Sequence, residues 1–425
     1  MRPIVAIIAL GLAAGVVHAN GRPPLTNGVV FRPGDSETLY VRSTFGLLIS
    51  SDAGCTFRWV CEQCIGYGGT FDPKYAVASD GTIFATTFTG LRVSRDGGCS
   101  FTTATAELAV GDPGRIADVS VEALDIGPTG EVWVATADSG KPNNVYRSTD
   151  NGVTFAPRGM LSPTIWWRSV AVAPSNPLRV YVTGYEVTSS AAPITHVYRT
   201  DDGGETWTEL AVGSLAPILL VAAVDPLDPG TVFLRSGATS AGDRLYRSSD
   251  AGATFTEVLV TTEPIHDVLI ASAATVLVAT EAGTLFRSDT AGAAFAPVAG
   301  APRVGCLGKR PDGTLLTCAA NWEPDFMAVG TSSDATHWDP LFRFSQLAGP
   351  LVCPAGTQGH ETCEQLWPGL DEQFGVVGPA CGATPDGAEP SSGGCCEAGG
   401  PAPIGLAMMT FALMIVRRRR PAPRR

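Results

Sequence analysis

A single phrase recurs seven times along this 425-residue chain and constrains its fold more than any other feature. Its template is Ser/Thr-x-Asp-x-Gly-x-Thr-Trp/Phe, and the clearest copy runs from Thr200 to Trp207. The other complete copies begin at Ser50, Ser94, Ser148 and Ser248. Two copies are degenerate: the sixth has Thr290 where the aspartate belongs, and the seventh keeps Asp334 but is one residue shorter.

The spacing of the copies predicts the architecture. Successive third positions are separated by 44, 54, 52, 48, 40 and 44 residues. The unit that starts near Val119 shows four strand-like runs, at 119–126, 131–136, 144–148 and 154–158. Such a period with four short strands per unit is typical of a β-propeller, and one unit cannot bury its sheet alone. We therefore predict an all-β fold: a seven-bladed propeller of four-stranded antiparallel blades.

Each copy of the phrase lies between two strand-like runs, so we place it in the hairpin between strands three and four of its blade. Glycine supplies backbone with φ > 0, and an aspartate accepts hydrogen bonds from the N–H groups of its own turn. The terminal aromatic ring is expected to be buried beneath the hairpin. Catalysis or metal binding is the alternative for these carboxylates, but repetition in every unit favours a structural role. The residues concerned are Asp52, Asp96, Asp150, Asp202, Asp250 and Asp334.

The phrase resembles the Asp box, or BNR repeat, of sialidases, sortilin-type receptors and related propellers. This resemblance implies a propeller fold. It implies no particular ligand or reaction.

Both ends of the chain look like processing segments. Residues 1–19 have a positive start, an apolar stretch and a Val17-His18-Ala19 cleavage pattern, so we expect a secretory signal, with an uncleaved anchor as the alternative. The propeller is expected over 20–346, a cysteine-containing segment over 347–377, and a flexible linker over 378–400. A hydrophobic sorting helix and an arginine-rich tail are expected over 401–425.

The tail has a characteristic order of parts. Cys395 and Cys396 precede an apolar run at 404–416, and four arginines follow it. This order resembles the MYXO-CTERM sorting tail of myxobacteria and their relatives. The resemblance implies a myxosortase-like processing enzyme, anchoring in the membrane through a lipidated cysteine, and display on the cell surface. Which of the two adjacent cysteines is modified stays open, and an ordinary C-terminal membrane anchor is the alternative.

Charge excludes one class of partner. The chain carries 41 acidic and 29 basic residues, a net charge of −12, and loss of both processed ends would leave about −18 by the same count. Because an acidic surface repels phosphate backbones, nucleic acid is not expected as a partner. We expect a monomer without a cofactor or a metal.

The cysteines point to disulfide bonds, since an exported chain meets an oxidising compartment. Cys306 and Cys318 flank a turn and are expected to pair across it, and Cys353 and Cys363 are expected to close a small loop. The pairing of Cys55, Cys61, Cys64 and Cys99 stays open. A redox or zinc site at Cys61 and Cys64, and a metal half-site around His360, are the less favoured alternatives.

Strand alternation sorts the loops of a propeller onto two faces. The repeated phrases and the loops between strands one and two share one, which we call the repeat-turn face. The loops between strands two and three and between blades share the other, the long-loop face, where longer loops lie at 137–143, 185–196 and 236–243. Loops on a rigid scaffold often bind ligands. The candidate ligand residues there are Trp166, Trp167, Tyr185 and Trp322, although Trp166 or Trp167 could instead pack between blades.

Two function classes remain. The first is an exported, non-catalytic propeller that binds a glycan or a protein through the long-loop face. The second is a sialidase-like or other glycoside hydrolase, but no residue is assigned a catalytic role. Arg147, Arg199, Arg247 and Arg287 recur at one position per blade, which indicates a structural role rather than the substrate-binding arginine trio of sialidases. A photosystem-type assembly factor is a third possibility, disfavoured by the export signal and the sorting tail.

Overall fold

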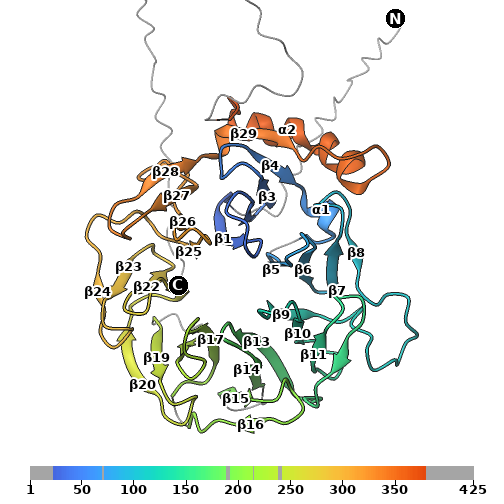
Figure 1. Ribbon diagram of the computed structural model, residues 1–425. Helices are drawn as coiled ribbons and strands as arrows, with labels where there is room; N and C mark the ends of the chain where they lie inside the picture. Colours follow the sequence, from blue (N-terminus) through green and yellow to red (C-terminus); the bar gives the residue numbers. More distant parts are fainter. Residues whose placement is uncertain (1–22, 69–70, 188–191, 214, 238–241, 380–425) are drawn as a thin grey trace, which may run out of the picture. The chain divides into compact units, whose positions relative to one another are not determined.

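Seven β-sheets stand in a ring, and each is built on four strands that follow one another in sequence (Figure 1). The computed structural model describes residues 23–68, 71–187, 192–213, 215–237 and 242–379, which all belong to one compact unit. The seven-bladed, four-stranded architecture expected from the spacing of the repeats is confirmed. The signal segment, Cys395, Cys396 and the rest of the tail lie outside the described residues.

The first three blades occupy the region up to residue 157. Blade 1 contains β1 (Thr26–Phe31), β2 (Leu39–Ser43), β3 (Gly46–Ser50) and β4 (Phe57–Val60). Blade 2 contains β5 (Tyr75–Val77), β6 (Ile83–Thr87), β7 (Gly90–Ser94) and β8 (Thr102–Thr103). Blade 3 contains β9 (Val121–Ile126), β10 (Val132–Thr136), β11 (Val145–Ser148) and β12 (Ala156–Pro157).

The other four blades follow the same plan. Blade 4 contains β13 (Ile165–Ala173), β14 (Asn176–Glu186), β15 (Ile194–Thr200) and β16 (Thr208–Glu209). Blade 5 contains β17 (Leu219–Val224), β18 (Val232–Ser236), β19 (Arg244–Ser248) and β20 (Thr256–Val260). Blade 6 contains β21 (Ile265–Ile270), β22 (Val276–Thr280), β23 (Leu285–Ser288) and β24 (Ala296–Pro297). Blade 7 contains β25 (Cys306–Lys309), β26 (Leu315–Cys318), β27 (Val329–Ser332) and β28 (Asp339–Phe342).

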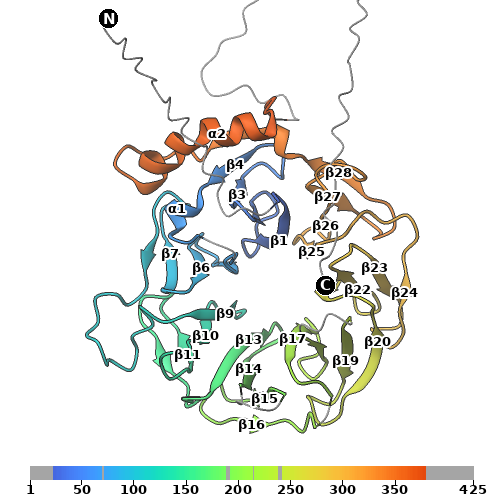
Figure 2. The same cartoon turned by 180° about the vertical axis from the view of Figure 1, so that it is seen from behind.

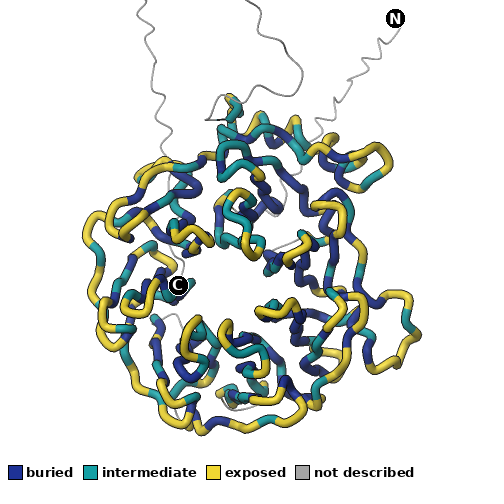
Figure 3. The backbone as a smooth tube through the Cα atoms, viewed as in Figure 1, coloured by how far each residue is buried: buried dark blue, intermediate teal, exposed yellow. Residues whose placement is uncertain are grey.

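The second strand of a blade forms the centre of its core. In β10 all five residues are buried, and the same holds in β6 and β22. Both faces of a blade are covered by its neighbours, so a central strand buries both rows of its side chains (Figure 3). The first strands of the blades line the middle of the ring, which leaves them partly exposed in β9, β17 and β21.

Among the described residues, the first and last blades meet through packing and share none of the strands β1 to β4 and β25 to β28. The Thr26 hydroxyl of blade 1 donates to the Ala328 carbonyl beside blade 7 at 2.6 Å. The rings of Phe57 and Phe342 lie 4.4 Å apart across the same junction. The chain then crosses to blade 1, where β29 (Leu347–Pro350) pairs in parallel with β4 as a fifth strand. The segment expected to follow the propeller therefore begins inside its first sheet.

Helical structure gathers at blade 1. The described helices are α1 (Glu62–Ile65), the 3-10 turn η1 (Phe344–Gln346), the π-helical turn η2 (Gly359–Cys363) and α2 (Glu364–Phe374). Both views place α2 on the outer side of blade 1 (Figure 2). In the described part of the chain, none of these helices has the length and apolarity needed to cross a bilayer.

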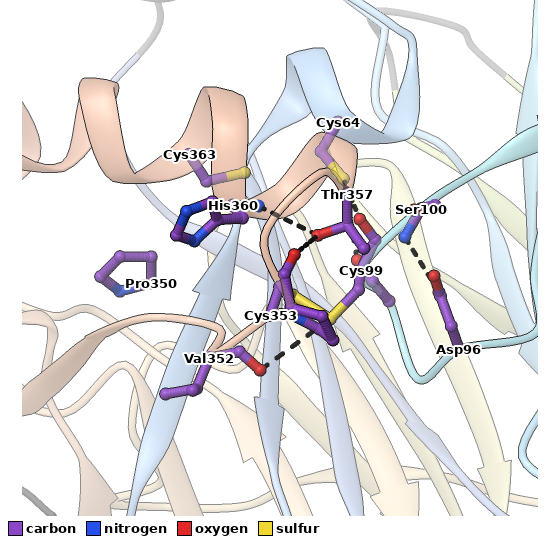
Figure 4. The surroundings of a disulfide bond; sticks show 12 residues. Cys64, Asp96, Cys99, Ser100, Pro350, Val352, Cys353, Thr357, His360 and Cys363 are labelled. Atoms are coloured by element: carbon purple, nitrogen blue, oxygen red, sulfur yellow. Dashed lines mark hydrogen bonds between the residues drawn. A yellow bond between two sulfur atoms is a disulfide. The ribbon is translucent and has the colours of Figure 1, made fainter.

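Two long-range disulfides fasten the C-terminal segment. Cys61 after β4 pairs with Cys363, and Cys99 in the repeat turn of blade 2 pairs with Cys353 (Figure 4). The expected Cys353–Cys363 pair is therefore wrong. The Gly359 N–H donates to the Cys99 carbonyl at 2.8 Å, so the segment is docked on blades 1 and 2 and its two thiols meet different partners.

The remaining described cysteines are also placed. Cys306 and Cys318 are directly opposed on β25 and β26 and form a disulfide. Cys55 is disulfide-bonded as well, and Cys64 is a buried free thiol. Because Cys61 is bonded to Cys363, the Cys61–Cys64 pair does not form a redox centre or a zinc half-site.

Candidate functional site

The carboxylates of the repeat turns are occupied by bonds within their own turns. Asp202 accepts the Thr206 N–H at 2.9 Å and the Thr206 hydroxyl at 2.6 Å, and the Thr200 hydroxyl donates to it at 2.7 Å. The side-chain bond from Thr206 is the main reason that the pKa of Asp202 lies well below its ordinary value. The same pattern of a preceding Ser hydroxyl and a following N–H recurs at Asp52, Asp96, Asp150 and Asp250.

The degenerate copies keep this chemistry with other atoms. The Thr290 hydroxyl accepts the Ala294 N–H at 3.1 Å in place of a carboxylate. In the shortened turn, Asp334 accepts the N–H groups of Thr336 and His337 at 2.8 and 2.9 Å.

We expected the terminal aromatic ring of the repeat beneath its own hairpin. The structure instead places this ring between neighbouring blades. Trp207 of blade 4 packs against Trp133 of blade 3, and its indole N–H donates to the Arg158 carbonyl of blade 3 at 2.8 Å. At Gly204 a Cβ would lie 2.9 Å from the Trp133 ring. The turn therefore needs glycine for close approach to the preceding blade as well as for its φ of +90°.

The recurring arginines join the same junctions. An Arg199 guanidinium N–H donates to the Ala251 carbonyl of the next blade at 2.6 Å, and Arg287 reaches the Asp334 carbonyl at 2.5 Å. Arg147 stacks over the Trp133 ring, with its Cζ 5.5 Å from the ring centroid. The recurring positions of the repeat turns thus stabilise the contacts between neighbouring blades.

The aromatic residues expected on the long-loop face differ in their exposure. Trp167 is only 1% exposed and belongs to the core between blades 3 and 4, so it cannot contact a ligand. Trp166 and Tyr185 are directly opposed on β13 and β14, partly buried, with ring centroids 6.1 Å apart. Trp322, between β26 and β27, is 51% exposed. Both the Trp166–Tyr185 pair and Trp322 are therefore available at this face.

A cavity of about 250 Å³ lies among the first strands of blades 3 to 6. Lys74 directly precedes β5, His266 is the second residue of β21, and Arg235 is the last but one of β18. First strands begin, and second strands end, at the long-loop face, so the cavity lies toward that face. Its charged or titratable lining side chains are Lys74, Arg168, Arg235, His266 and Asp267.

The cations are held by acids set behind the lining. Glu122 is only 10% exposed, and its carboxylate lies 3.2 Å from an Arg168 nitrogen and 3.9 Å from the Lys74 ammonium. The ammonium also donates to the Glu122 carbonyl at 2.8 Å. Desolvation is the main cause that lowers the pKa of Lys74 to about 8. The nearby cations Arg168, Arg42 and Arg235 lower this pKa further, and Glu122 acts in the opposite direction.

The carboxylate in the lining is already satisfied. Asp267 accepts the Val268 N–H at 2.9 Å and, across the blade junction, the Leu307 N–H at 2.8 Å. Burial raises its pKa. Asp125 makes the same two bonds from blade 3 to Ile126 and to Val172 of blade 4, and burial raises its pKa to about 6. Both residues connect neighbouring first strands.

The residues that line this cavity were not identified from the sequence. Lys74 is one of three lysines in the chain and directly precedes β5, and Arg168 and Arg235 lie in mostly apolar runs. A charged residue within or directly beside an apolar run was the available signal. A second cavity, of about 420 Å³, lies at the repeat-turn face between blades 1 to 3, and its carboxyl group is the buried Asp125.

No family model and no curated protein matches this chain. Similarity to solved structures is low in sequence. An ancestral GH74 enzyme is 16% identical with a TM-score of 0.47, covering 63% of this chain and 36% of its own length. YCF48 bound to D1 peptide is 14% identical with a TM-score of 0.43, covering 66% of this chain and 84% of its own. An extracellular domain of a hybrid two-component system from B. thetaiotaomicron is 12% identical with a TM-score of 0.45, covering 69% and 38%. This chain spans about a third of the GH74 enzyme's length.

Proposed function

We propose that this chain is an exported, surface-anchored, non-catalytic propeller that binds a glycan or a protein ligand through its long-loop face. The observation that carries the proposal is the cavity toward that face, into which Lys74, Arg168 and Arg235 project from three different blades. Convergent polar groups in a concave site are the usual form of a ligand pocket. At the opposite face the repeat-turn carboxylates are used within their own turns, as expected of Asp boxes.

Export and anchoring are supported by separate features. The signal-like segment 1–19 and the MYXO-CTERM-like tail with Cys395 and Cys396 suggest passage across the inner membrane, processing by a myxosortase-like enzyme and display at the cell surface. The long-range disulfides Cys61–Cys363 and Cys99–Cys353 suit an oxidising compartment.

A glycoside hydrolase is the alternative, and the cavity chemistry disfavours it. Such enzymes use two carboxyl groups on either side of the scissile bond, roughly 5 to 9.5 Å apart. Here the lining carboxylate, Asp267, is held by two backbone N–H groups. Glu122 stands behind the lining and is paired with Arg168. Neither is placed as a free acid or nucleophile.

Binding by the purified full-length chain to arrays of glycans and of proteins from the cell surface tests the proposal. Trp166→Ala and Trp322→Ala should abolish capture of any ligand that the wild-type chain retains. Leu227→Ala is the matched control, since Leu227 is exposed on the loop between β17 and β18 at the repeat-turn face. Loss of binding in Leu227→Ala alone, absence of binding to every arrayed ligand, or release of sugar from a bound glycan would contradict the proposal.

A further inference from the structure

We propose that the central cavity is an anion site and that the long-loop face binds an acidic glycan, one of whose carboxylate or sulfate groups enters between Lys74, Arg168 and Arg235. This inference deepens the proposed function and rests on it, because it assigns a ligand class to the same face.

The balance of charge at the cavity is the first argument. Three cationic side chains line it against one carboxylate, whose oxygens are both taken by backbone N–H groups. The chain as a whole carries a net charge of −12. Cations that face the cavity, with Glu122 and Asp243 set behind them, attract anions locally while the acidic outer surface repels them.

The orientation of the cations is the second argument. Glu122 lies behind Lys74 and Arg168 and fixes both, yet their side chains remain 41% and 35% exposed. The Lys74 ammonium has three donors and already contacts the Glu122 and Arg168 carbonyls and the Glu122 carboxylate, so it contributes mainly its charge. A guanidinium has five donors, so the contact of Arg168 with Glu122 leaves donors available. Arg235 is held from behind in the same way, with its Nη1 3.7 Å from the buried Asp243 carboxylate. The two arginines thus keep N–H groups for a ligand, and Lys74 adds its positive charge beside them.

Mutual repulsion of the cations is the third argument. Desolvation is the main cause that lowers the pKa of Lys74, Glu122 acts against it, and Arg168, Arg42 and Arg235 each lower it further. A cluster that repels itself is stabilised when an anion binds among its members. The desolvated surroundings strengthen each such contact.

The aromatic residues of the long-loop face favour a sugar chain over an acidic peptide. The Trp166–Tyr185 pair and Trp322 are on the long-loop face as well, and flat aromatic rings stack well on sugar rings. At about 250 Å³ the cavity is below the roughly 300–1,000 Å³ of pockets that enclose a whole small molecule. It suits a single charged residue of a longer polymer that runs over the face.

Calorimetric titration of the full-length chain with defined polymers tests the inference. Polygalacturonate supplies carboxylates, dextran sulfate supplies sulfates, dextran is its neutral counterpart, and poly-L-glutamate is the acidic peptide. At least one of the two acidic glycans should bind, with an affinity that falls as sodium chloride rises, and dextran should not bind. The better acidic glycan identifies which anionic group is preferred.

Variants show where the anion binds. Lys74→Met and Arg168→Gln should each weaken binding of the acidic glycan by about 10- to 100-fold, the range expected for a charge-assisted hydrogen bond. Lys309→Met is the matched control: its ammonium donates to the Ala271 carbonyl of the neighbouring blade at 2.6 Å, but it ends its first strand at the repeat-turn face. Lys74→Arg keeps the charge and should retain most of the affinity. Thermal unfolding of each variant verifies that it is folded.

The outcomes separate the two proposals. Binding of a neutral glycan or of a protein that Lys74→Met and Arg168→Gln leave unchanged would overturn the anion site and leave the proposed function standing. Equal or tighter binding of poly-L-glutamate would overturn the glycan assignment. Failure of the wild-type chain to bind any polymer or arrayed ligand would overturn both.

Discussion

The indole ring of Trp207 stands edge-on to that of Trp133, with centroids 6.4 Å apart, although the two residues belong to neighbouring blades. The same relationship closes the ring, where Phe57 of the first blade packs on Phe342 of the last. Phe155, Phe255 and Phe295 likewise lie in core clusters shared with the preceding blade. The repeated phrase therefore packs each blade against the preceding one, which explains why every blade contains a copy.

The close approach at Gly204 gives the first prediction. Gly204→Ala should destabilise the protein by about 1–3 kcal/mol more than Gly130→Ala, because overpacking a well-packed site costs that much. The two glycines have nearly equal φ, +90° and +91°, but a Cβ at Gly130 would meet nothing within 4 Å. Free energies of unfolding from urea titration measure the difference. Equal losses in the two variants would show that only backbone conformation demands glycine there.

The disulfides give a second prediction. Removing Cys61–Cys363 with the double variant Cys61→Ser/Cys363→Ser should cost about 4 kcal/mol, against about 3 for Cys306→Ser/Cys318→Ser, by the loop-entropy relation. The partners of the first bond are 302 residues apart, but the remaining Cys99–Cys353 bond shortens the loop that it closes to about 50 residues. The partners of the second bond are 12 residues apart. Urea titration under non-reducing conditions compares the two. A larger loss in the Cys306–Cys318 variant would contradict the view that the C-terminal segment fastens the closed ring.

The hydrogen bonds of Asp250 predict a specific dependence of stability on pH. The side-chain bond from Thr254 is the main cause that lowers its folded-state pKa to about 2, below the ordinary value near 4. Its contribution is therefore fully present above about pH 4 and is lost as the pH falls through about 2. The melting temperature of the wild type should exceed that of Asp250→Asn above pH 4, and the two should converge toward pH 2. A gap that stays constant with pH would show that the charge of this residue is not involved.

Lys74 predicts a pH dependence of ligand binding. With a pKa of about 8, its ammonium is charged at pH 7 and largely neutral at pH 9. The charged and titratable groups around it are Glu122 on β9, Arg168 on β13, Arg42 on β2, Arg235 on β18, and His266 and Asp267 on β21. Affinity for the acidic glycan should fall between pH 7 and 9, and Lys74→Arg should remove most of that fall. A similar fall in Lys74→Arg would assign the titration to another group.

The sequence allowed the blade number and the position of the repeat to be predicted, because both follow from local spacing. It could not show that Trp207 faces blade 3, since the hydrophobicity of a ring does not say which side of the sheet it covers. The Cys353–Cys363 prediction failed for a related reason. Proximity along the chain gave no sign that the segment docks on Cys61 and Cys99, more than 250 residues away.

The same limit applies to the central cavity. Lys74, Arg168 and Arg235 are separated by 94 and 67 positions and meet only because the ring places their strands around one axis. Trp166, Tyr185 and Trp322 could be assigned to the long-loop face from strand alternation alone. Alternation puts Trp166 and Trp167 on opposite faces of β13 but does not say which face packs against blade 3. The structure shows that this face carries Trp167.

Acetylation of lysines, read by mass spectrometry, tests most directly whether ligand binds at the centre of the long-loop face. The chain has only three lysines, Lys74 in the cavity, Lys141 between β10 and β11, and Lys309 at the repeat-turn face. At pH 8, a saturating concentration of polygalacturonate or dextran sulfate should strongly slow the acetylation of Lys74. The acetylation rate of Lys309 should stay unchanged. Equal protection of both lysines, or protection of Lys309 alone, would contradict the account.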